Sequence, residues 1–186
     1  MPRTAIIAIS AAALALVGTV GFSQMSGHGH GGGHGNHVHD EVTMPGLRGR
    51  DATPEESAEI GELFRNFRTL ERSVENLPDG IRTVTYSTDP QVMDVLVSHV
   101  TGMIDRVETD RDPEIIIQSP TLDIFFQRGD TIETEIEVTD EGIVVIQTST
   151  DAKVVTALQV HAAEVTAMAE RGMQAVHEMM SNRASN

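Results

Sequence analysis

The sequence predicts an α+β protein in which an α-β-β-α unit occurs twice. The two hairpins would form one four-stranded antiparallel sheet with helices packed on one face. Two observations lead to this prediction: a gapless internal repeat, and strand-like alternation followed by helical periodicity at the same places in each copy. A third observation, the composition of residues 1–52, predicts that a signal peptide and a flexible His- and Gly-rich tail precede the folded part.

The internal repeat has an offset of 62 residues. Residues 70–104 align with residues 132–166 without gaps, and ten of the thirty-five pairs are identical. The match extends upstream, where Phe64 meets Phe126, and it pairs His99 with His161. A two-stranded hairpin is only marginally stable alone, so we expect the two copies to share a core.

Local patterns place the elements of each copy. The Thr53-Pro54-Glu55-Glu56 sequence is a capping box that opens a helix, and Ser119-Pro120 opens its counterpart. Alternating strands, Gly-containing turns and longer helices follow, and the last helix is expected to reach Met180. The expected organisation is a signal peptide at 1–23, a tail at 24–52 and a domain at 53–182, with copies at about 54–108 and 118–181.

The N-terminus indicates export. Arg3 precedes an apolar run over residues 5–20, and Gly21 and Ser23 are the small residues of a cleavage site before Gln24. This pattern predicts a periplasmic or secreted protein. The alternative is an uncleaved inner-membrane anchor, because residues 5–22 approach the minimum length that spans a bilayer.

Composition excludes several classes of function. The net charge of −15 and the lack of a basic stripe argue against nucleic acid and anionic membrane surfaces as partners. The absence of Cys excludes thiolate zinc sites, iron–sulfur clusters and covalently attached haem. No catalytic motif stands out, so we expect a noncatalytic protein. Exposed edge strands would favour a homodimer.

The paired histidines are the main functional candidates. His99 and His161 lie three residues after Leu96 and Leu158, on the apolar stripe of each long helix. Two such imidazoles could hold a transition metal or act as axial ligands of a noncovalent haem b. Each could equally be an ordinary core histidine that hydrogen-bonds a backbone or carboxylate partner.

Further metal ligands are suggested by residue type. Thioethers and imidazoles together favour copper, and the extra candidates in the folded part are Met103, Met173 and His177. The tail could collect copper, Zn²⁺ or Ni²⁺ loosely through five histidines: His28, His30, His34, His37 and His39. The leading hypothesis is therefore an exported copper-binding protein. The alternatives are a haem b protein for electron transfer or sensing, and a structural or partner-binding envelope module.

Overall fold

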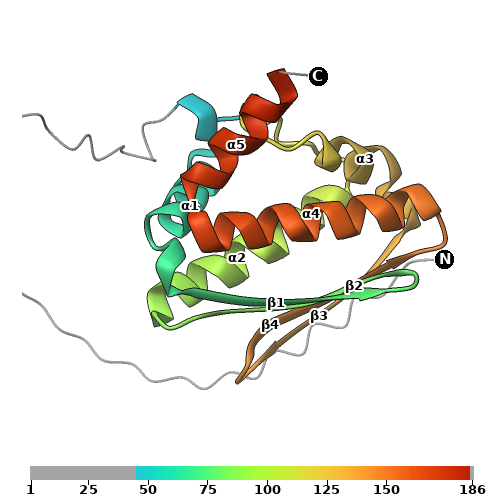
Figure 1. Cartoon of the computed structure of the whole chain (residues 1–186), viewed down its shortest axis with the longest axis horizontal. Coiled ribbons are helices and arrows are strands. Elements are labelled where there is room, and N and C mark those ends of the chain that lie inside the picture. Colours follow the sequence, from blue (N-terminus) through green and yellow to red (C-terminus); the bar gives the residue numbers. More distant parts are fainter. Residues whose placement is uncertain (1–44, 185–186) are drawn as a thin grey trace, which may run out of the picture.

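The computed structural model describes residues 45–184 and shows an α+β fold. This part of the chain forms one four-stranded antiparallel sheet and five α-helices, which confirms the predicted class. The strand order is β1-β2-β4-β3, and the strands are β1 (Leu70–Leu77), β2 (Gly80–Ser87), β3 (Ile132–Thr139) and β4 (Gly142–Ser149). The helices lie on one side of the sheet (Figure 1). The expected signal peptide and the five tail histidines fall outside the described residues.

The second hairpin repeats the first at an offset of 62 residues. All four strand ends match at this spacing, and a 3-10 turn precedes each hairpin, at Phe67–Thr69 and Gly129–Thr131. β2 and β4 pair at the centre of the sheet, with Thr83 opposite Val145. Because Val145 is also 62 positions after Thr83, an approximate twofold axis passes through this pair. Equivalent strand residues therefore lie symmetrically about the middle of the sheet.

Capping residues begin the main helices. α1 (Pro54–Arg65) follows Thr53, whose Oγ1 accepts a hydrogen bond from Glu56 N at 3.1 Å while Thr53 N donates to Glu56 Oε2 at 2.8 Å. The predicted capping box is thus present. Asp89 and Asp151 accept hydrogen bonds from backbone N–H groups at the starts of the two long helices, α2 (Pro90–Glu108) and α4 (Ala152–Arg171).

Two helix ends differ from the sequence-based expectation. The shorter helix, α3 (Thr121–Arg128), begins one residue after Pro120, and Ser119 Oγ accepts from Thr121 N at 3.2 Å. The long helix α4 does not continue to Met180. It ends before Gly172, and a separate helix, α5 (Met173–Ala184), follows. Gly172 has a φ of 56°, a conformation that glycine adopts without steric cost.

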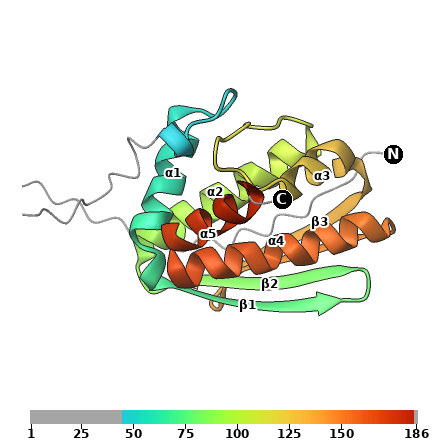
Figure 2. The same cartoon turned by 45° about the horizontal axis from the view of Figure 1, so that its top comes forward.

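α4 packs mainly on the strands of the first half, whereas α2 packs on β2 of its own half and also reaches β4. α4 runs along β1 and β2 (Figure 2), and its Val154 and Leu158 pack with Ile81 of β2. On α2, Leu96 packs with Ile143 and Val145 of β4. The two halves therefore bury their apolar faces against each other, and the hydrophobic effect holds them in one core.

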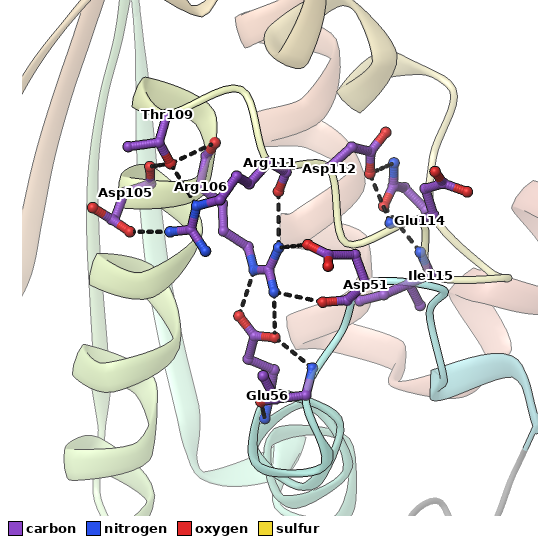
Figure 3. Close-up of polar contacts among 11 residues, drawn as sticks. Asp51, Glu56, Asp105, Arg106, Thr109, Arg111, Asp112, Glu114 and Ile115 are labelled. Atoms are coloured by element: carbon purple, nitrogen blue, oxygen red, sulfur yellow. Dashed lines mark hydrogen bonds and ion pairs between the residues drawn. The ribbon is translucent and has the colours of Figure 1, made fainter.

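A buried arginine ties the start of the described chain to the end of α2. Arg106, with 3% of its surface exposed, uses all five N–H donors (Figure 3). It donates to both Glu56 carboxylate oxygens at 2.5 and 2.8 Å, and to Asp51 Oδ2 and the backbone oxygens of Asp51 and Arg111 at 2.8–2.9 Å. Burial would lower the arginine pKa, but the bonds to Glu56 raise it and lower the pKa of Glu56.

The far face of the sheet has no helix over it in Figure 1. Glu133, Glu135 and Glu137 of β3 point to this side and are exposed, as their alternation predicted. None of the helices between residues 45 and 184 is both long enough and apolar enough to cross a membrane.

Candidate functional site

His99 and His161 occupy equivalent places on the two long helices. Each lies three residues after a core leucine, Leu96 on α2 and Leu158 on α4. Both side chains are largely enclosed, with 23% and 27% of their surfaces exposed. The His161 ring also meets the Phe125 ring edge-on, with centroids 5.3 Å apart. The helical periodicity of the sequence therefore placed both imidazoles correctly on the inward-facing stripe.

Each imidazole has a carboxylate beside its Nδ1 atom. Glu59 Oε2 of α1 lies 4.0 Å from His99 Nδ1, and Glu164 Oε2 of α4 lies 3.4 Å from His161 Nδ1. Glu59 also accepts a hydrogen bond from Ser98 Oγ at 2.5 Å. At 3.4 Å the His161–Glu164 contact is misaligned for a hydrogen bond, and both of its atoms are shielded from solvent.

The two carboxylates come from positions that are not equivalent in the repeat. At the offset of 62 residues, Glu59 corresponds to Thr121, and Glu164 corresponds to Gly102. Thr121 Oγ1 donates to Glu164 Oε1 at 3.3 Å, so the small residue in one half contacts the acid. In the other half, the acid is on α1 and the glycine leaves open space on α2. Each half thus keeps one carboxylate beside its histidine, although a different helix supplies it.

The electrostatics of the site keep His99 neutral near pH 7. Burial lowers the pKa of His99, while the carboxylates of Glu59 and Glu56 oppose the shift and nearby His161 adds to it. Burial would raise the pKa of Glu164, but contact with His161 and hydrogen bonds from the Ser119 and Thr121 hydroxyls outweigh burial and lower it. A neutral imidazole is the form that binds a metal ion.

Among the other candidate ligands of the folded part, Met103 lies on the same helix as His99, whereas Met173 and His177 lie on α5. His177 is exposed on α5, Met173 is the first residue of that helix, and Met103 is partly buried on α2, one turn after His99. No set of three or more His, Asp or Glu side chains among residues 45–184 is arranged to hold a metal ion. His28, His30, His34, His37 and His39 lie outside the described residues.

Sequence reasoning missed both carboxylates. Glu164 could have been found, because a position three residues after a histidine on a helix is a neighbour of that histidine. Glu59 offers no such signal, since it lies forty residues before His99 on another helix.

A pocket of about 510 Å³ opens beside Glu164. It lies between the start of α3 and the helices α4 and α5, and Thr121, Met168 and Met179 are among its lining residues. The pocket gives solutes access to the side of the Glu164 carboxylate, whereas His99 and His161 do not line it.

Comparison of the chain with protein-family models, with curated protein sequences and with solved structures finds no match.

Proposed function

We propose that the protein is an exported, noncatalytic transition-metal-binding protein, with copper as the favoured metal and His99 and His161 as the ligands. The observation that carries the proposal is the carboxylate beside Nδ1 of each imidazole, at 4.0 Å in one half and 3.4 Å in the other. A carboxylate at one ring nitrogen is the common way to orient an imidazole so that its other nitrogen faces a metal.

The exchange of carboxylate positions supports this proposal over a packing role. We propose that the two halves descend from one duplicated α-β-β-α unit, whose copies have since diverged at most positions. Packing alone would require a residue of similar size at each position. Instead, Glu59/Gly102 in one half corresponds to Thr121/Glu164 in the other, so a histidine–carboxylate contact is present in both halves while the local residues differ.

Copper is favoured because its ligands can be few and can include thioethers. Neutral imidazole suits copper, and Met103 on the next turn after His99 is a candidate third ligand. In this proposal the tail histidines collect copper loosely before it reaches the pair. The signal-peptide pattern of residues 1–23 supports export to the periplasm.

The test uses the full chain with the five tail histidines replaced by serine, so that only the folded part can bind. Copper stoichiometry and affinity are measured by competition with a chromophoric chelator. We expect about one copper per chain, lost in His99→Gln and His161→Gln and retained in His177→Gln, which changes an exposed histidine. Unchanged copper affinity in the His99 and His161 variants would contradict the proposal. A Soret band in the purified protein would show that it binds haem and would contradict copper as the ligand.

A compensating pair of substitutions tests the carboxylate role. Glu59→Thr copies the residue of the second half and should weaken copper binding by about 10- to 100-fold. Adding Gly102→Glu, which copies the other equivalent residue, should restore much of the affinity. If Glu59→Thr binds copper as the parent does while remaining folded by circular dichroism, the carboxylate does not orient the ligand.

A further inference from the structure

Arg72 is a partly buried cation that has no anionic partner among residues 45–184. Its side chain lies on the helix-covered face of β1, where Nη1 donates to Thr85 Oγ1 at 2.5 Å. Nε is shielded from solvent and makes no hydrogen bond, and Arg72 forms no ion pair with any residue of the described range 45–184. Burial lowers the pKa of Arg72 to about 10, so the guanidinium remains charged at neutral pH. An isolated buried charge is costly, and native proteins normally pair it.

A pocket of about 280 Å³ lies against this side chain, and we call it the Arg72 pocket. Phe67, Arg68 and Leu70 line it from the start of the first hairpin, and Thr166, Ala169 and Glu170 line it from the last turns of α4. Arg68 lies over the Phe67 ring, 5.6 Å from its centroid, and adds a second cation at the edge. The pocket therefore combines two guanidinium groups and one carboxylate with an apolar wall.

The same place in the other half is filled. Thr166 and Ala169 of α4 correspond to Ile104 and Val107 of α2, which are larger and pack in the core. Phe67 corresponds to Gly129, where an added Cβ would lie 2.4 Å from Val107 O, so no room remains there.

The charge is also absent from the other half. Arg72 and Thr85 correspond to Thr134 and Gln147, a neutral pair joined by a hydrogen bond of 3.4 Å. Arg68 corresponds to Asp130. The sheet thus tolerates a small neutral residue at the Arg72 position. The hollow and the cations both distinguish the first half from the second, at positions that lie together in space.

We propose that the Arg72 pocket binds a small oxyanion, whose negative charge pairs with the Arg72 guanidinium. Guanidinium groups recognise carboxylates and inorganic oxyanions through planar, charge-assisted hydrogen bonds. The apolar wall of Phe67, Leu70 and Ala169 favours a carboxylate that carries a short alkyl chain, and the volume admits a molecule of that size. This site is separate from the histidine pair.

The test titrates the full chain with sodium propionate, sodium phosphate or, at matched ionic strength, sodium chloride. We expect a saturable rise in melting temperature with an oxyanion that chloride does not reproduce, because a ligand that binds the folded state stabilises it. Propionate acting at lower concentration than phosphate would identify a carboxylate site, and the reverse order would identify an inorganic oxyanion site.

Matched variants locate the effect. Arg72→Thr, which copies Thr134, should weaken binding by about tenfold or more, since it removes charge-assisted hydrogen bonds. Arg82→Thr removes a cation from the opposite face of the same sheet and should bind as the parent does. Copper binding should be unchanged in Arg72→Thr, which keeps this proposal distinguishable from the proposed metal function.

A direct readout follows oxyanion binding in the unmodified chain. The Nε–H resonance of Arg72, assigned by its loss in Arg72→Lys, should shift on titration of the unmodified chain with the oxyanion. If neither propionate nor phosphate moves this resonance or the melting temperature beyond the chloride control, the proposal is overturned.

Discussion

Replacing Arg106 with methionine should destabilise the protein strongly. Methionine occupies the equivalent position of the second half, at Met168. The substitution therefore tests whether the first half can use the residue that the second half has at this position. The substitution removes five hydrogen bonds at once, two to Glu56, one to the Asp51 carboxylate and two to backbone oxygens.

The expected loss is about 3 kcal/mol. Removing one partner of a buried ion pair typically costs about 3–5 kcal/mol, because the other charge stays buried. The lower end applies here, since Asp51 is 62% exposed and Glu56 is 25% exposed, so water can reach both carboxylates after the change. For a chain of this size, this loss corresponds to a fall in melting temperature of roughly 10 °C.

Urea unfolding followed by circular dichroism measures the change. The matched control is Arg111→Met, whose ion pair with Asp105 joins side chains that are 50% and 63% exposed, and it should cost at most about 1 kcal/mol. Arg106→Lys keeps the charge but not the planar fork, and it should fall between the two. Equal losses for Arg106→Met and Arg111→Met would refute the reasoning, because burial would then play no part.

Three further outcomes are expected. The folded-state pKa of His99 lies below its ordinary value of 6.5, so unfolding takes up a proton and stability is lost as the pH falls through and below 6.5. His99→Gln should therefore flatten the dependence of the urea midpoint on pH between about pH 7 and 5.5. The same pH dependence in His99→Gln and in the parent would contradict this. Gly142→Ala should destabilise by more than about 1 kcal/mol in urea unfolding, because Gly142 has a φ of 122° and the added Cβ would lie 2.4 Å from Thr85 O; a neutral result would show that the turn can relax. Gly102→Ala should instead stabilise the protein by about 0.5–1 kcal/mol, because the added Cβ at this helical position meets no other atom. A lower melting temperature in Gly102→Ala than in the parent would show that the position is not open.

Local sequence accounts for much of the architecture. Alternation with turn glycines located both hairpins, and the repeat offset of 62 residues predicted that their ends would match, which they do. Helical periodicity also placed His99 and His161 on inward faces. The predicted extent of the last helix was wrong, because Gly172 has a positive φ and a new helix begins after it. Nothing in the apolar pattern distinguishes this glycine from one that is tolerated within a helix.

What the sequence determined by itself is the set of elements and the repeat, because hydrogen-bonding periods, caps and turns depend on residues a few positions apart. Only the tertiary structure decided which distant groups meet. Glu59 reaches His99 from another helix, Glu56 and Asp51 enclose Arg106, and α4 leaves a hollow beside Arg72. These contacts depend on how the helices dock on the shared sheet, and docking is set by the shape of the whole core rather than by any local pattern.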